Sequence, residues 1–246
     1  MLLPLYDSNP LRHIRIAYVM WSVIAVCVAI FVYQATLPAN EAGRFIFTYG
    51  AIPADLFGYA ERPPEIDVVP SFMTVLTSMF LHGSVMHLLG NMLFLWVLGD
   101  NIEDSMGHRR FIVFYLLCGI FAAFSHIVLE PASTVPMIGA SGAISGVIGA
   151  YLMLHPHATI RTLVLRFVVP LPAWVVLGLW IALQIFSAAM SKPGEPGVAW
   201  WAHIGGFAAG VVLILPLRRR GVRLFDRGEE HPVITRTLIP RSGKRP

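Results

Sequence analysis

Polar residues in three apolar segments of the sequence have the side chains that acyl-transfer chemistry needs. Ser141 lies in the run Gly-Ala-Ser-Gly at the start of one apolar segment, and His203 lies near the start of another. His87 and Asn91 are four positions apart in a third. Histidine and asparagine are costly to bury in lipid, so within membrane spans they are functional candidates. Serine can supply a nucleophile, histidine a base, and histidine and asparagine can donate hydrogen bonds to an oxyanion.

The composition indicates a helical membrane protein. Of the 246 residues 56% are hydrophobic and only 13% are charged, and the mean hydropathy is +0.68. Long apolar stretches of this kind are typical of membrane spans. Cys27 and Cys118 both fall in apolar runs, where we expect packing residues and no disulfide. The net charge of +4 does not indicate nucleic-acid binding, because the basic residues lie at the ends of apolar segments and in a tail.

The elements that must position these residues are six predicted spans, which make an all-α bundle. A helix needs about 20 residues to cross the hydrocarbon core. The predicted spans cover residues 14–36, 76–99, 111–130, 138–155, 171–190 and 199–217. The stretch 71–99 is too long for one untilted span, so its first part, SFMTVLTSMF, could belong to the outer interface. The connection 37–70 carries five prolines, is expected to be irregular, and could lie against the membrane surface.

The basic residues predict the orientation of the chain. Fifteen of the 18 Lys and Arg residues fall in one alternate set of connections and three in the other. This asymmetry predicts cytoplasmic N and C termini and an even number of spans. The expected organisation is a cytoplasmic N-terminal segment (1–13), a six-helix domain (14–217) and a basic cytoplasmic tail (218–246). The tail is expected to anchor the topology, and contact with anionic lipid is possible.

The depths of the polar residues support one common site. Counted from an inner end near Asp100, His87 lies about 20 Å along its span at 1.5 Å per residue. The same count places Ser141 and His203 about 21 Å from the inner ends of their spans. In a core about 30 Å thick, all three side chains then lie roughly 10 Å below the outer surface.

Small residues indicate how two of the spans could meet. Stripes of glycine and alanine spaced by four let helix backbones approach closely in lipid. If the stripes of the fourth and sixth spans face each other, Ser141 and His203 come within reach. The alternative is that the stripes only pack helices together. The residues are Gly142, Gly146 and Ala150 on the fourth span, and Gly206 and Gly210 on the sixth.

Together these segments resemble the rhomboid family of intramembrane serine proteases. GASGAISGVIGAY resembles the family's GxSG segment, AHIGGFAAG its histidine segment and HGSVMHLLGN its HxxxxHxxxN segment. The three segments lie in the family's order on the second, fourth and sixth spans, and the resemblance covers roughly residues 71–217. It implies a compact six-helix bundle with a water-accessible cavity that opens to the outside.

The resemblance also implies a role for each residue. Ser141 matches the family's nucleophile and His203 its general base, while His87 and Asn91 match the side-chain donors to the oxyanion. The backbone N–H of Ser141 is expected to complete the oxyanion hole. Neither the fourth nor the sixth span contains Asp or Glu, so we expect a Ser–His dyad with the imidazole held by packing. No cofactor and no metal are expected. The substrates implied are transmembrane proteins in the lipid bilayer, cleaved near the outer membrane face.

Two positions differ from the family or lie outside its chemistry. Many members carry an aromatic residue four positions after the nucleophile, where this chain has Ser145, a second hydroxyl. We prefer Ser141 as the nucleophile because it alone matches GxSG. Glu103 and Gly107 match a family-like ExxxG segment, in which we expect the carboxylate to hold donors of the cytoplasmic loops. The first-loop Trp-Arg pair of some members is not apparent in 37–70.

Two other functions are compatible with an apolar chain of this kind. A non-catalytic member of the same fold would bind membrane clients. Such proteins usually lack the nucleophile or the base, whereas this chain has both Ser141 and His203. A small transporter is disfavoured, because the sequence has no inverted repeats and no acidic residue within a span. For the protease, we expect the fifth span and the loop Lys192–Gly197 to act as a gate. A six-span plan without extra domains suits a multi-pass protein of a bacterial inner membrane.

Overall fold

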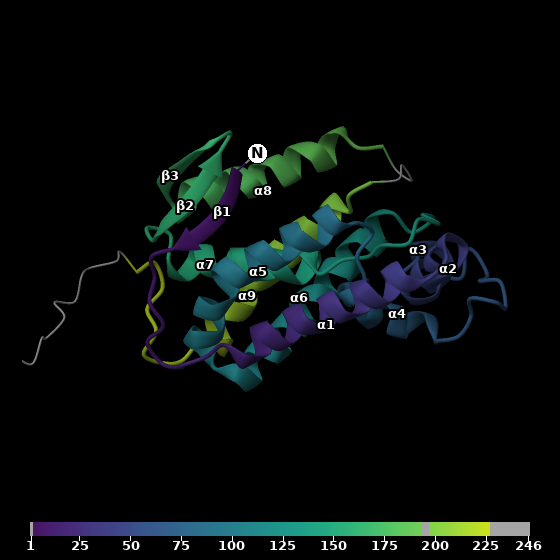
Figure 1. The fold of residues 1–246 in the computed structure, drawn as a ribbon, viewed down its shortest axis with the longest axis horizontal. Coiled ribbons are helices and arrows are strands. Elements are labelled where there is room, and N and C mark those ends of the chain that lie inside the picture. The colour runs from purple at the N-terminus through teal and green to yellow at the C-terminus, as the bar shows by residue number, and fades with distance from the viewer. Residues whose placement is uncertain (1, 193–196, 227–246) are drawn as a thin grey trace, which may run out of the picture.

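The long apolar segments of the sequence form helices that lie side by side in the computed structural model, which describes residues 2–192 and 197–226 (Figure 1). Isoleucine, leucine, valine and alanine fill these segments, and the buried members form one continuous core. The principal helices are α1 (Tyr18–Thr36), α5 (Val85–Met106), α6 (His108–Leu129), α7 (Ser141–Leu154), α8 (Ala173–Met190) and α9 (Trp200–Leu217).

Five helices of the described chain are long and apolar enough to cross a membrane: α1, α5, α6, α8 and α9. Six spans were expected, and the one absent from this set is the fourth, 138–155. Its helix α7 has 14 residues, or about 21 Å of helix, which is shorter than the hydrocarbon core. The residues before Ser141 are not helical, because Gly139 has a φ of +121° that a helix does not accommodate.

The stretch 71–99, which holds the second predicted span (76–99), divides as its excess length suggests. A short helix α4 (Ser71–Thr77) and a 3₁₀ turn η1 (Ser78–Phe80) precede α5, which begins at Val85. The hydroxyl oxygen of Ser84 accepts the N–H of His87 and caps α5. The helix then continues to Met106, six residues beyond Asp100, the inner end from which the depth of His87 is counted.

The connection 37–70 contains two further short helices, α2 (Ala39–Tyr49) and α3 (Pro53–Leu56). A proline lies at the start of each helix: Pro38 precedes α2, and Pro53 occupies the first turn of α3. Arg62 braces the end of this connection. Its guanidinium lies 2.9 Å from Asp55 and 3.0 Å from Asp67, and donates to the carbonyl of Val69.

The described chain is mostly helical, as expected of an all-α membrane protein, but a three-stranded antiparallel sheet, which was not expected, lies against the helices at one end of the molecule (Figure 1). Its order is β1 (Leu2–Asp7), β2 (Thr159–Val164) and β3 (Phe167–Pro172). Ile160 and Thr162 of β2 are buried and alternate with exposed neighbours, as in a strand with one covered face. The sheet is fixed to the bundle by the hydroxyl of Tyr151, which donates to Asp7 at 2.6 Å.

Two adjacent carboxylates of α5 hold the N-terminal part of the chain. Glu103 accepts the N–H groups of Val19 (3.0 Å) and Met20 (2.8 Å) in the first turn of α1. These groups have no partner within their own helix, so Glu103 acts as the cap that α1 lacks. Asp104 accepts the N–H groups of residues 12, 13 and 14. Glu103 thus holds chain donors as expected, although they belong to the start of α1.

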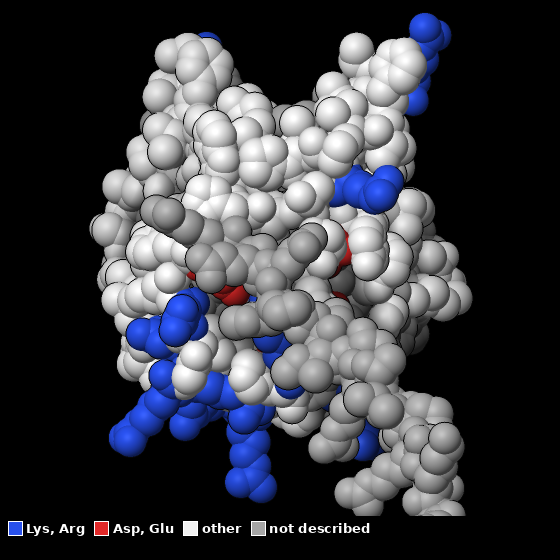
Figure 2. Space-filling model, turned by 90° about the vertical axis from the view of Figure 1, so that its left-hand side faces the viewer, with Lys and Arg blue, Asp and Glu red and all other residues white. Residues whose placement is uncertain are grey.

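Basic side chains gather at the same end of the molecule (Figure 2). Residues 218–226 lie there beside the N-terminal segment (Figure 1). The N–H of Arg219 donates to Ser105 of α5, and the N–H of Phe225 donates to Met153 of α7. The first part of the predicted tail is therefore bound to the helix ends, and its remainder, 227–246, lies outside the described residues.

Candidate active site

The site is built on a close backbone contact between α7 and α9. A Cβ atom at Gly206 would overlap the carbonyl oxygen of Gly142, and one at Gly210 would overlap that of Gly146. The two glycine stripes therefore face each other, as the sequence predicts. Only glycine permits this separation, since any side chain would fill the space between the two backbones. The contact brings the first turns of the two helices together.

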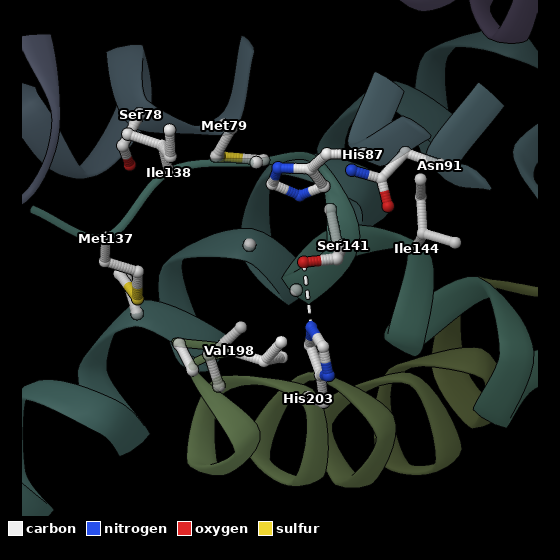
Figure 3. Close-up of a pocket in the computed structure, with 18 of the residues that line it drawn as sticks. Ser78, Met79, His87, Asn91, Met137, Ile138, Ser141, Ile144, Val198 and His203 are labelled. Carbon is white, nitrogen blue, oxygen red and sulfur yellow. Dashed lines mark hydrogen bonds between the residues drawn. The ribbon is translucent and has the colours of Figure 1, made fainter. Parts of the chain in front are cut away.

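Ser141 and His203 meet at this contact, although 62 positions separate them in the chain. Ser141 is the first residue of α7, and its Oγ lies 2.8 Å from Nε2 of His203 (Figure 3). The imidazole is buried, with 8% of the residue exposed. A serine hydroxyl becomes an effective nucleophile when a neighbouring base accepts its proton. The geometry therefore suits proton transfer from Ser141 to His203.

His87 and Asn91 lie on the other side of Ser141 (Figure 3). A Cβ atom at Gly139 would be 2.7 Å from Nε2 of His87 and 3.6 Å from Nδ2 of Asn91, so both side chains approach the backbone that leads to Ser141. Asn91 is buried, and its Nδ2 has no hydrogen-bond partner within the described chain. A buried unpaired donor is costly, so it indicates a group that serves a ligand.

The start of α7 adds backbone donors to these two side chains. The first N–H groups of a helix have no partner within the helix, and they lie at the positive end of its dipole. Ser141 occupies this first turn. The preceding Gly139 is fixed because its N–H donates to the carbonyl of Ser78 at 2.9 Å. Negative charge that develops beside Ser141 would thus meet backbone and side-chain donors together.

These groups line a cavity of about 650 Å³. Its walls are mainly apolar and come from α4 and η1, from α5 to α9, and from the segments before α7 and α9. Polar atoms gather where Ser141, His203, His87 and Asn91 meet, and Met79, Met137 and Ile138 form much of the remaining wall (Figure 3). A cavity of this size can take several side chains of an extended peptide.

His203 is held by contacts that the sequence reasoning missed. Its Nδ1 lies 2.7 Å from Oε1 of Gln184 on α8. The rings of Trp180 and Trp200 lie 5.8 Å and 6.1 Å from the imidazole, centre to centre. The sequence does carry a signal for Gln184, which is a polar residue inside an apolar span and, unlike a carboxylate, is uncharged.

Ser145, the second hydroxyl, is engaged elsewhere. It is fully buried, and its Oγ donates to the carbonyl oxygen of Ser141 at 2.6 Å. Serine in a helix commonly makes this bond to the backbone one turn earlier. The described hydrogen bond of the imidazole Nε2 is to Ser141.

The profile of the Rhomboid domain matches residues 70–220, which is more than half of the chain and includes all four residues of the site. The chain belongs to the rhomboid family. Similar rhomboid proteins include the mitochondrial Rhomboid protein 1 of Saccharomyces cerevisiae, which is 30% identical over 199 residues. That alignment covers 74% of this chain and 54% of the yeast protein.

A second rhomboid relative is named as a protease. Rhomboid protease GluP of Bacillus subtilis is 32% identical over 143 residues, which is 58% of this chain and 26% of that protein. The mitochondrial RHOMBOID-like protein 12 of Arabidopsis thaliana is 28% identical over 163 residues, or 59% of this chain and 46% of that protein. The chain spans about half or less of the length of these curated relatives. With its apolar helices, it is an integral membrane rhomboid protein.

Proposed function

We propose that this rhomboid protein is an intramembrane serine endopeptidase that cleaves membrane-anchored proteins near the outer membrane face. The observation that carries the proposal is the 2.8 Å separation between Ser141 Oγ and His203 Nε2, at a cavity where the buried Nδ2 of Asn91 has no partner within the described chain. The Rhomboid domain match and the relative named as a protease support the same chemistry.

In the proposed reaction, Ser141 attacks the carbonyl carbon of the scissile peptide bond while His203 accepts the hydroxyl proton. His203 then gives the proton to the leaving amine, which leaves an ester on Ser141. In the second half of the reaction water attacks the ester while His203 accepts its proton. The proton then returns to Ser141 as the acid product is released. The oxyanion of both tetrahedral intermediates is stabilised by the N–H of Ser141 and by the side chains of His87 and Asn91.

The substrate must present an extended segment to Ser141. A membrane-spanning helix hides its carbonyl groups in hydrogen bonds, so it has to unwind locally before attack. Segments with helix-breaking residues and small side chains near the scissile bond are the favoured substrates. Water must also reach the ester, which requires that the cavity be hydrated although it lies below the surface.

The proposed topology has six spans, with α7 as the fourth and both termini in the cytoplasm. The basic end of the molecule would face the cytoplasm by the positive-inside rule (Figure 2). The site would then lie toward the outer face, because Ser141 begins α7 at the end away from the basic residues. A bacterial inner membrane is the proposed location. GluP is a bacterial relative, whereas the yeast relative is named as mitochondrial.

Helix α8 is the proposed gate for substrate. Phe94 of α5 and Trp180 of α8 lie 6.2 Å apart, centre to centre, and both line the cavity. Residues 193–196 of the predicted gate loop lie outside the described residues. Cysteines at positions 94 and 180, joined by a short cross-linker, should stop cleavage of a transmembrane substrate. Unchanged cleavage after complete cross-linking would refute the gate.

The function is tested by cleavage of a fluorescent transmembrane substrate in detergent. The purified parent should cleave it, and Ser141→Ala and His203→Ala should not. Ser22→Ala and His157→Ala are matched controls, because both side chains are exposed outside the site. Equal cleavage by Ser141→Ala would overturn the nucleophile assignment. No cleavage by the parent across several substrates would favour a non-catalytic rhomboid that binds membrane clients.

A further inference from the structure

Gln184 is a buried amide in a helix that is otherwise almost wholly apolar. It lies on α8, is 5% exposed, and contacts the active-site histidine of α9 through its Oε1. Burying an amide in an apolar span is unfavourable unless its polar atoms are paired. Both polar atoms of Gln184 have partners, so the side chain is held in one orientation.

The second partner decides which way the amide faces. Nε2 of Gln184 lies 3.1 Å from the carbonyl oxygen of Trp180, one turn earlier on α8. A carbonyl oxygen can only accept a hydrogen bond, so the NH₂ group must face Trp180. Oε1 must therefore face His203, where it can only accept. Consequently Nδ1 of His203 must carry the proton in the neutral imidazole.

This proton position decides whether His203 can serve as a base. With Nδ1 protonated, the lone pair of Nε2 is free to accept the proton of Ser141 at 2.8 Å. In the other tautomer, Nε2–H would point at the serine and could accept nothing. A neutral imidazole in water favours the proton on Nε2, so the productive tautomer needs an acceptor beside Nδ1.

We propose that Gln184 is a positioning residue that fixes the productive tautomer of His203, in the place where other serine hydrolases use a carboxylate. The inference rests on the proposed function, since it gives Gln184 a role in that reaction. It differs from ring packing, because Trp180 and Trp200 contact the imidazole without selecting a tautomer. Because Gln184 belongs to α8, it can hold the productive tautomer of His203 only while α8 is packed against α9.

The direct test is the ¹⁵N NMR spectrum of histidine-labelled protein in detergent at a pH where the imidazole is neutral. The signals of His203 are assigned by their loss in His203→Ala. The parent should show Nδ1 protonated and Nε2 unprotonated. Gln184→Met, which has a similar shape and no amide, should move the proton toward Nε2. An Nε2–H tautomer in the parent, or an unchanged Nδ1–H tautomer in Gln184→Met, would overturn the proposal.

Two further variants distinguish the loss of the amide group from a general effect of substitution in α8. Leu183→Met places the same residue on the exposed face of α8 and should leave the tautomer unchanged. Gln184→Glu keeps an acceptor beside Nδ1 whether the carboxyl group is ionised or protonated, so it should keep the Nδ1–H tautomer. If Gln184→Met does not fold, the parent spectrum alone still tests the proposal.

Kinetics give an independent readout. Gln184→Met should lower kcat by about tenfold to a hundredfold with little change in KM, because the imidazolium formed during the reaction would have its buried Nδ1–H left unpaired. Gln184→Glu should restore kcat toward the parent value. Full kcat in Gln184→Met, beside loss of cleavage in Ser141→Ala, would refute this inference and leave the proposed function standing. No cleavage by the parent would refute the function, while the NMR test still decides the tautomer.

Discussion

Gly206 of α9 lies directly against the carbonyl oxygen of Gly142 on α7, with no room for a Cβ atom between them. Each glycine is one helical turn or less from a residue of the proposed dyad, Ser141 or His203. The distance between the reacting atoms is therefore set by the separation of two helix backbones. A small increase in that separation would move the hydroxyl out of reach of the imidazole.

Gly206→Ala tests this dependence. The added methyl group must push the backbones apart, which should lower the free energy of unfolding by about 1–3 kcal/mol and lower kcat in the protein that remains folded. Thermal unfolding in detergent and cleavage per folded molecule measure the two effects. Gly178→Ala on α8 is the control, because its Cβ would meet no described atom within 4 Å. Equal behaviour of the two variants would contradict the account.

The oxyanion donors should act on the transition state rather than on substrate binding. Asn91→Ala and His87→Ala should each lower kcat with little change in KM, by the roughly 10²–10³-fold typical of one oxyanion donor. Steady-state kinetics on the transmembrane substrate measure the effect. Asn40→Ala and His157→Ala remove exposed side chains of the same types and should change neither constant. A change confined to KM would mean that Asn91 or His87 binds substrate instead.

The elements of the site that the sequence predicts are those with a local signal. Glycines spaced by four predict the meeting of α7 and α9, and polar residues in apolar segments predict which side chains gather there. The length of α7 was not predictable in this way, because hydropathy does not show that Gly139 has a φ of +121°. The pairing of β1 with β2 was not predicted because the two strands lie more than 150 positions apart, whereas β2 and β3 form a local hairpin between the fourth and fifth predicted spans. The pairing of Gln184 with His203 depends on how α8 packs, which no spacing records.

Glu103 should contribute to the stability of the fold and not to catalysis. Glu103→Ala would leave the N–H groups of Val19 and Met20 unpaired, that of Met20 fully buried, so we expect a loss of about 2 kcal/mol or more in the free energy of unfolding. Cleavage per folded molecule should stay at the parent value, because Glu103 lies on α5 far along the helix from His87. Loss of cleavage in a variant that unfolds at the parent temperature would contradict this role.

Asp7 should make stability depend on pH. Burial raises the pKa of this carboxyl group to about 6, although the hydrogen bond from Tyr151 lowers it. Between about pH 4 and pH 6 this carboxyl group then binds more protons in the folded protein than in the unfolded chain, so its own contribution to stability should fall as pH rises through this range and level off above it. Unfolding of the parent and of Asp7→Asn at several pH values isolates this contribution, because the stability of the parent relative to the variant should fall as pH rises through this range. The same pH dependence in parent and variant would assign it to other groups.

The measurement that tests the central claim most directly is covalent labelling with a fluorophosphonate, followed by mass spectrometry of the digested protein. The reagent needs an activated serine and an oxyanion site, but no transmembrane substrate. The account predicts one modified residue, Ser141, with labelling abolished in His203→Ala and retained in Ser22→Ala. Labelling of Ser145 in place of Ser141, or undiminished labelling of Ser141 in His203→Ala, would contradict it.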